Sequence, residues 1–241
     1  VAQSGAERVH LVAHSMGNRA LIEALQTWMA NHGPGQQVAG TQATGAQPAG
    51  TQAKRRAFGQ VVFTAPDVDR DYFTDVIDSL AQTAERVTLY ASDKDLALKT
   101  SQAVHGAPRA GMAGANIITR AGLDSIDMSS VEADMLGHNY YAADAGAIYD
   151  LFRLLWRGDP PPQRCGMSAR TPASRANVWL FNVDVCRGQD LLEAGVLIKR
   201  FGDRARKRVL DRIAQITDPQ QKQDWSRILV RLDTLLNNRR P

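Results

Sequence analysis

The chain has 241 residues, of which 44% are hydrophobic and 22% are charged. That length can bury a sizeable core, and the composition excludes a disordered or fibrous protein. The net charge of +4 is only mildly basic and indicates neither nucleic acid nor a membrane as partner, and no apolar run is long enough for a transmembrane helix.

The first predicted elements are a short buried strand and a helix. Residues 8–13 are rich in Val, Leu and Ala, and apolar residues then recur at helical spacing to about Asn31. Gly, Gln, Ala, Thr and Pro dominate residues 33–54. Such a segment cannot bury enough apolar surface to offset the entropy lost on ordering, so we predict a flexible surface insertion there.

Strands and helices alternate over the next part of the chain. The predicted strands cover residues 58–65, 86–91 and 123–128, with a further candidate at Ile117-Ile118. The predicted helices run from about Phe73 to Ala84, from Leu96 to His105 before Gly106, and onward from Asn139. This alternation predicts an α/β fold, a mostly parallel sheet with helices on both faces.

A run of three prolines at 160–162 divides the chain. We predict an α/β domain over residues 1–160 and a mainly helical appendage over 163–241, with a strand or extended segment at 178–185 and three amphipathic helices after it. The appendage carries a basic cluster, Lys199, Arg200, Arg204, Arg206, Lys207, Arg208 and Arg212. We interpret the cluster as a solvated helix face, with nucleic-acid or acidic-partner binding as the alternative.

The segment Ala13-His14-Ser15-Met16-Gly17 lies between the first strand and the first helix. A serine on such a sharp turn, flanked by small residues, is typical of the G-x-S-x-G nucleophile elbow, with alanine here in place of the first glycine. We predict Ser15 as nucleophile and the backbone N–H of Met16 as an oxyanion donor. The alternative is that Ser15 only caps the helix.

A serine nucleophile needs a base, and in this chain order the base follows the last strand of the domain. The sequence has five histidines. His138 is the one in a loop after the last predicted strand, so we predict it as the base, with a solvated loop histidine as the alternative.

The acid that orients the base is expected in a loop after an earlier strand. Asp95 is the predicted residue, because the apolar pattern resumes directly after it; Asp93 is the nearby alternative. Asp67 and Asp69 follow the preceding strand and are further alternatives. Loop aspartates are also common turn formers.

Four motifs occur in an order typical of a known family. They are residues 9–19 (Val-His-Leu-Val-Ala-His-Ser-Met-Gly-Asn-Arg), 65–69 (Ala-Pro-Asp-Val-Asp), 89–98 (Leu-Tyr-Ala-Ser-Asp-Lys-Asp-Leu-Ala-Leu), and 126–129 (Ile-Asp-Met-Ser) through 137–141 (Gly-His-Asn-Tyr-Tyr). Residues 8–157 thereby resemble bacterial α/β-hydrolases of unknown function, often described as esterase/lipase superfamily enzymes. The resemblance implies a serine hydrolase fold with Ser15, Asp95 and His138 as its triad.

The chain departs from that fold at its start, where seven residues precede the elbow strand. About four further strands and the loop with a second oxyanion donor are expected upstream. Losing one such donor typically costs about 10²–10³ in rate. We therefore expect a partial α/β-hydrolase fold whose N-terminal strands are missing, weakly active or inactive by itself.

The function predicted is hydrolysis of a carboxylic ester through an acyl-enzyme. The expected partner is a small-molecule ester or acyl substrate, and we expect no metal, cofactor or nucleic acid. An acyltransferase or a peptidase would use the same triad and is a further alternative. The alternative is a non-catalytic, truncated hydrolase or a module that binds an unidentified partner through its helical tail. The two cysteines, Cys165 and Cys186, indicate neither a disulfide framework nor a metal site and leave the compartment open.

Overall fold

The computed structural model describes residues 6–32, 56–131, 138, 139, 142, 144–170, 177–183, 185 and 188–237. Its first half contains β1 (Leu11–His14), α1 (Gly17–His32), β2 (Phe58–Thr64), α2 (Arg70–Leu80), β3 (Ala84–Ala91), α3 (Leu96–His105) and β4 (Leu123–Asp127). Its second half contains α5 (Ala145–Arg157), β5 (Met167–Ala169), β6 (Val178–Phe181), α6 (Gly188–Phe201), α7 (Ala205–Gln215) and α8 (Pro219–Asn237). Short 3-10 turns lie at Gly114–Asn116, Pro161–Gln163 and Gly202–Arg204.

The strands form a six-stranded sheet in the order β1-β2-β3-β4-β6-β5. Each neighbouring pair from β1 to β6 is parallel, and only β5 runs antiparallel, at one edge. The inner strand β2 is buried along its whole length, as expected of a parallel sheet covered on both faces. The α/β prediction with a mostly parallel sheet is therefore confirmed.

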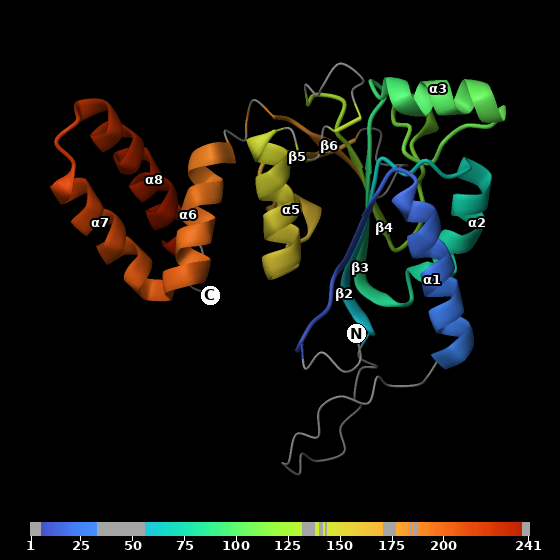
Figure 1. Ribbon diagram of the computed structural model, residues 1–241, viewed down its shortest axis with the longest axis horizontal. Coiled ribbons are helices and arrows are strands. Elements are labelled where there is room, and N and C mark those ends of the chain that lie inside the picture. The colour runs from blue at the N-terminus through green and yellow to red at the C-terminus, as the bar shows by residue number, and fades with distance from the viewer. Residues whose placement is uncertain are drawn as a thin grey trace, which may run out of the picture.

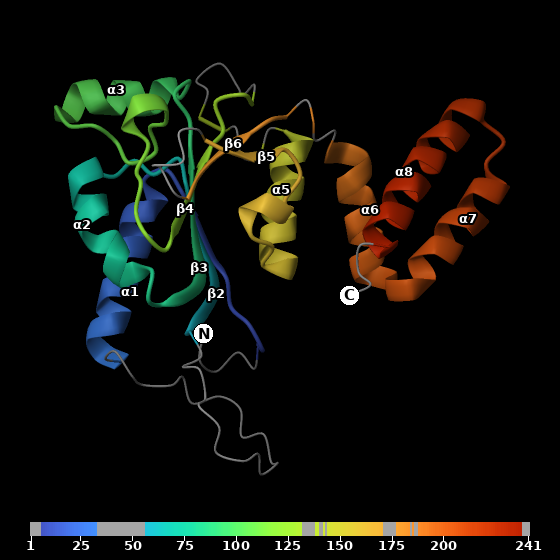
Figure 2. The same ribbon diagram turned by 180° about the vertical axis from the view of Figure 1, so that it is seen from behind.

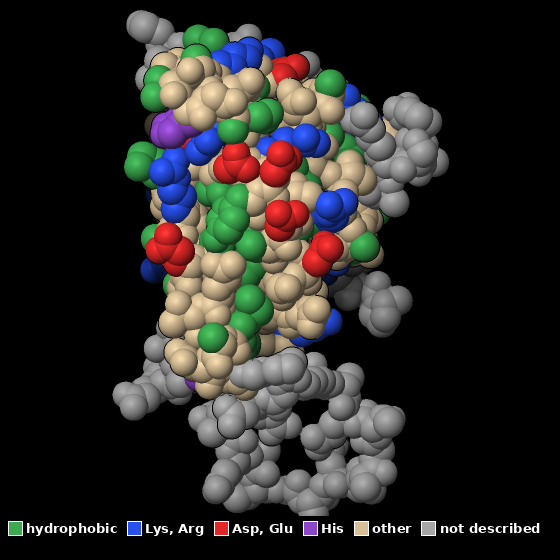
Figure 3. All heavy atoms as spheres, turned by 90° about the vertical axis from the view of Figure 1, so that its right-hand side faces the viewer, with side chains coloured by type: hydrophobic (Ala, Val, Ile, Leu, Met, Phe, Trp, Pro, Cys, Tyr) green, Lys and Arg blue, Asp and Glu red, His purple; other side chains and the backbone are tan. Residues whose placement is uncertain are grey.

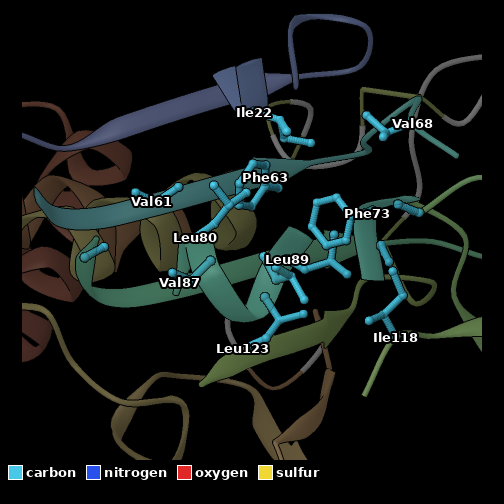
Figure 4. Close-up of a cluster of buried hydrophobic side chains, with 14 of the residues drawn as sticks. Ile22, Val61, Phe63, Val68, Phe73, Leu80, Val87, Leu89, Ile118 and Leu123 are labelled. Carbon is cyan, nitrogen blue, oxygen red and sulfur yellow. The ribbon is translucent and has the colours of Figure 1, made fainter. Parts of the chain in front are cut away.

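Helices cover both faces of this sheet (Figure 1), with α1 and α2 on one side and α5 on the other. One hydrophobic cluster joins α1 and α2 to the sheet, and its centre is drawn in Figure 4, where Ile22, Phe63 and Phe73 converge. A second cluster joins α5 to the opposite face, around Val62, Tyr90 and Tyr149. These two clusters bury both faces of the inner strands, while the edge strands β1 and β5 stay partly exposed.

Three local predictions differ from the structure. Ile117 and Ile118 are buried but form no strand, and the Ile118 carbonyl accepts from Ser125 Oγ at 2.6 Å. Ala84 begins β3 rather than ending a helix, and α5 begins at Ala145 rather than near Asn139. The insertion predicted over residues 33–54 lies outside the described residues.

The C-terminal helices α6, α7 and α8 pack together on the far side of α5 from the sheet (Figures 1 and 2). A third hydrophobic cluster joins them around Ala194, Val209 and Leu232, and Trp156 of α5 packs against it. The three predicted helices are present. The division of the chain at about residues 160–163 stays a prediction, and β5 and β6 come from its C-terminal side.

Two further features concern cysteine and surface chemistry. Cys165 is disulfide-bonded, which corrects the expectation drawn from the cysteine count; the other cysteine, Cys186, lies outside the described residues. Two cysteines in a long chain carry no spacing pattern from which pairing could be predicted.

On the face that carries α1, α2 and α3, charges of both signs are interspersed (Figure 3). None of the helices in the described residues combines the length and apolar character that crossing a bilayer requires.

Candidate active site

The predicted site residues lie at the carboxyl ends of parallel strands. Ser15 follows β1, Asp95 follows β3, and His138 comes from the connection after β4. Because these strands are parallel, their carboxyl ends meet at one edge of the sheet, which is where open α/β sheets bind ligands. The topology thus brings together residues that are far apart in the sequence.

Ser15 has the backbone conformation of a tight strand-to-helix turn. Its φ is +52°, in the left-handed region that a non-glycine residue adopts only when its surroundings hold it there. The Ser15 N–H donates to the Thr64 carbonyl of β2 at 3.0 Å, and the Ser15 carbonyl accepts from the N–H groups of Asn18 (3.1 Å) and Asp67 (3.3 Å). These backbone bonds hold the strained turn from both sides.

Asn18 is a supporting residue that the sequence analysis missed. It is fully buried in the first turn of α1, and its Nδ2 donates to the carbonyls of Ser15 (2.8 Å) and Thr64 (3.1 Å). One amide therefore fastens the turn to β2. The available signal was an asparagine inside a helix, where its propensity is poor and a hydrogen-bonding role is the usual reason for it.

His138 and Asp95 form a direct hydrogen bond. His138 Nδ1 donates to Asp95 Oδ2 at 2.7 Å, and the His138 side chain is 17% exposed while that of Asp95 is 0% exposed. The other oxygen of Asp95 accepts from the Leu98 N–H at 2.9 Å and caps α3. The aspartate is thereby fixed at both oxygens, and it leaves Nε2 of His138 for other partners.

His14 contacts the same histidine. Its Nε2 donates to the His138 carbonyl at 3.2 Å, and the two ring centroids lie 4.6 Å apart. In the sequence, His14 is only the neighbour of Ser15. Its contact depends on where a distant loop packs, which no local sequence pattern reports.

The alternative acids have other partners. Asp67 accepts from Arg109 Nε at 2.7 Å and from Ser101 Oγ at 2.6 Å. Asp69 caps α2, because its side chain accepts hydrogen bonds from the backbone N–H groups of Asp71 and Tyr72. Asp93 is exposed, and its N–H donates to a serine hydroxyl. Of the four aspartates considered, Asp95 is the one that meets His138.

Asp67 is the centre of a charged network that supports the elbow. Burial alone raises the pKa of Asp67, but hydrogen bonds from Ser101 and Arg109 and the charges of Arg109 and Arg19 outweigh it, so that the pKa is lowered. Arg19, from α1, also donates through Nε to the Asp67 carbonyl at 2.8 Å. The network ties the helix that follows Ser15 to the end of β2.

Other expected features of the elbow are found only in part. Among the described residues, the Ser15 hydroxyl makes no hydrogen bond and the Met16 N–H has no acceptor, although catalytic contacts are often long in a ligand-free site. An added Cβ at Gly17 meets no atom within 4 Å, so the steric need expected there is not present. No cluster of three or more metal-ligating side chains occurs in the described part of the chain.

Comparison with protein families identifies a family that covers more than half of the chain. The sequence model of a family described as "Alpha/beta hydrolase of unknown function (DUF900)" matches residues 1–155. That range includes Ser15, Asp95 and His138 and ends within α5. Comparisons with curated proteins and with solved structures found no match.

Proposed function

Because this chain belongs to the family of alpha/beta hydrolases of unknown function, we propose that it is a serine hydrolase that cleaves carboxylic esters through Ser15, His138 and Asp95. The observation that carries the proposal is the 2.7 Å hydrogen bond between His138 Nδ1 and buried Asp95. With its proton on Nδ1, His138 keeps Nε2 as its basic nitrogen. His138 also contacts His14, which directly precedes the strained Ser15.

In the first half of the reaction, Ser15 Oγ attacks the carbonyl carbon of the ester. His138 Nε2 accepts the hydroxyl proton, and the electron pair of the carbonyl bond moves onto its oxygen. The N–H of Met16, at the start of α1, is the group we assign to that oxyanion, supported by the helix dipole. When the tetrahedral intermediate collapses, His138 gives its proton to the departing alcohol and an acyl-serine remains.

In the second half, water takes the place of the alcohol. His138 accepts a proton from water as it attacks the acyl-serine, and returns that proton to Ser15 Oγ as the carboxylic acid leaves. Asp95 stays ionised throughout, fixes the His138 tautomer with the proton on Nδ1, and stabilises the imidazolium that forms twice in each cycle. The sequence of steps needs no metal or cofactor.

Exposed apolar side chains favour an ester with an apolar part. Met16 is 62% exposed and directly follows Ser15, while Leu96 is 48% exposed and directly follows Asp95. Large apolar side chains that remain accessible next to reacting groups offer a surface for substrate burial. A small acyl ester is therefore the substrate class to try first.

The proposal is tested by hydrolysis of p-nitrophenyl acetate and butyrate. Replacing Ser15 by alanine removes the attacking oxygen, and we expect kcat to fall by about 10³-fold or more, to the level of background hydrolysis. The matched control is Ser79→Ala, which removes an exposed hydroxyl from α2 and should leave kcat unchanged. Equal rates for wild type and Ser15→Ala would contradict the proposal and favour a non-catalytic binding role.

A further inference from the structure

His14 links the strand that carries the serine to the residue that we assign as its base. It is the last residue of β1, and Ser15 follows it directly. It contacts His138 twice, through the 3.2 Å bond from Nε2 to the His138 carbonyl and through the rings, whose planes are inclined by 47°. A single side chain thus reaches both the backbone and the imidazole of His138.

The chemistry of this bond fixes the proton on His14. A carbonyl oxygen can only accept, so His14 Nε2 must carry the hydrogen. Burial lowers the pKa of His14, although the hydrogen bond to the His138 carbonyl raises it; the charge of His138 also lowers it and that of Asp95 raises it, with a net lowering. His14 is accordingly neutral at neutral pH and adds no positive charge beside His138.

We propose that His14 is a positioning residue, whose Nε2–H holds the His138 backbone so that the imidazole faces Ser15. The inference rests on the proposed function. Asp95 fixes the ring of His138 at Nδ1. The bond from His14 is a further attachment, made from the strand end next to the nucleophile, and it restrains where Nε2 lies.

Removing one attachment affects the chemical step more than substrate binding. A displacement of about 1 Å in a catalytic group can cost about 10²-fold in rate. His14 is not expected to touch the substrate in the ground state, so KM changes little. A fall in kcat without a matching rise in KM is what separates loss of positioning from loss of binding.

Two substitutions separate the N–H from the ring. His14→Phe keeps an aromatic ring of similar size without a donor, and we expect kcat to fall about 10–100-fold with KM within about 2-fold. His14→Gln places an amide N–H near the position of Nε2, and we expect it to keep kcat within about 3-fold of wild type. The control is His105→Phe, an exposed histidine at the end of α3, which should be silent.

Two kinetic results would overturn the inference. One is wild-type kcat in His14→Phe. The other is an equal loss in His14→Phe and His14→Gln that follows an equal fall in unfolding temperature, since this would mean that His14 contributes only packing.

A second measurement does not depend on hydrolysis. The proton of His138 Nδ1, held by Asp95, should give a downfield resonance in wild type and His14→Gln and be broadened or lost in His14→Phe. If no ester is hydrolysed and Ser15→Ala equals wild type, the proposed function fails, while this spectrum still decides whether His14 holds His138. An unchanged resonance in His14→Phe would contradict the inference.

Discussion

Asp95 combines two tasks that a sequence presents as alternatives. A loop aspartate is usually a turn former or helix cap, and Asp95 does cap α3 through one oxygen. Its second oxygen accepts from His138. The cap explains why the side chain is buried and rigid, and that rigidity suits it to orient a histidine. The cap and the bond to His138 are therefore compatible in one side chain, and its role as the acid of a triad stays a proposal.

The first prediction concerns this aspartate. Asp95→Asn keeps a good helix cap but no longer fixes the productive His138 tautomer, so we expect kcat to fall by about 10³–10⁴-fold with little change in stability. Asp93→Asn is the matched control, because Asp93 lies in the same loop with an exposed side chain. Ester hydrolysis and urea unfolding measure the two effects. A loss in Asp93→Asn, with Asp95→Asn active, would move the role to Asp93.

The positions of Ser15, Asp95 and His138 could be predicted because each follows a strand in a recognisable pattern. Asp95 was preferred to Asp93 because apolar residues resume after it, and this is also why it is buried as the first turn of α3 forms. His14 and Asn18 could not be assigned roles. Their partners, His138 and Thr64, come from distant segments, and only the packing of the sheet places them.

At the scale of elements, the loop around Gly111 supports the end of β2. Gly111 N–H donates to the Pro66 carbonyl at 3.0 Å, and an added Cβ there would lie 2.7 Å from the backbone carbon of Ala65. Ala65 itself has a φ of +42°. The close approach of two backbones lets β2 turn sharply beside the serine, and a larger residue has no room.

The second prediction follows from this close approach. Gly111→Ala should reduce the free energy of unfolding by about 1–3 kcal/mol, since backbone rather than a flexible side chain must shift. Gly17→Ala, where an added Cβ meets nothing within 4 Å, should be neutral or slightly stabilising because alanine favours the helix. Urea denaturation of both variants measures the difference. Equal stability of the two would contradict the account of this loop.

The third prediction concerns the Asp67 network that joins α1 to β2. Because the folded-state pKa of Asp67 is lowered, its contribution to stability is present above the unfolded-state pKa of about 4 and is lost as the pH falls through the folded-state value. The unfolding temperature of wild type should therefore exceed that of Asp67→Asn at neutral pH. The unfolding temperatures of the two proteins should converge in acid. A constant difference across the whole pH range would contradict a lowered pKa for Asp67.

On the scale of the whole molecule, a cluster of three buried polar side chains joins the sheet to α5 and to the segment that follows α5. Tyr90 of β3 donates to Asp150 of α5 at 2.6 Å, and Arg164, just before β5, lies 3.4 Å from both of them. All three are buried. Burial raises the pKa of Tyr90 and that of Asp150, the latter against the charge of Arg164. Arg164 thus provides much of the positive charge that compensates the buried Asp150 carboxyl, and Arg153 adds to it.

The fourth prediction tests this compensation. Arg164→Met leaves Asp150 buried without its cation and should cost about 3–5 kcal/mol of stability at neutral pH. Because the folded-state pKa of Asp150 is raised, its carboxyl is favoured in the neutral form, and the deficit should grow as the pH rises and shrink in acid. Adding Asp150→Asn should recover part of the loss. A deficit independent of pH, with no recovery in the double variant, would contradict the assignment.

The sequence predicted the class of fold but not its full layout. Alternating strands and helices indicated a mostly parallel sheet, which the structure confirms. The order of the strands, the return of β6 to pair with β4, and the contact between Trp156 and the C-terminal helices depend on long-range packing. Short apolar segments such as Ile117-Ile118 could not be separated from strands, since burial alone produces the same pattern.

The role of Ser15 as nucleophile is tested most directly by its capture with a fluorophosphonate probe, followed by peptide mapping of the modified residue. The probe reacts with a serine whose proton is taken by an adjacent base, and it needs no knowledge of the natural substrate. We expect modification at Ser15, slowed in Asp95→Asn and absent in Ser15→Ala. Absence of modification in the folded wild-type protein, or modification at another serine with Ser15 intact, would contradict it.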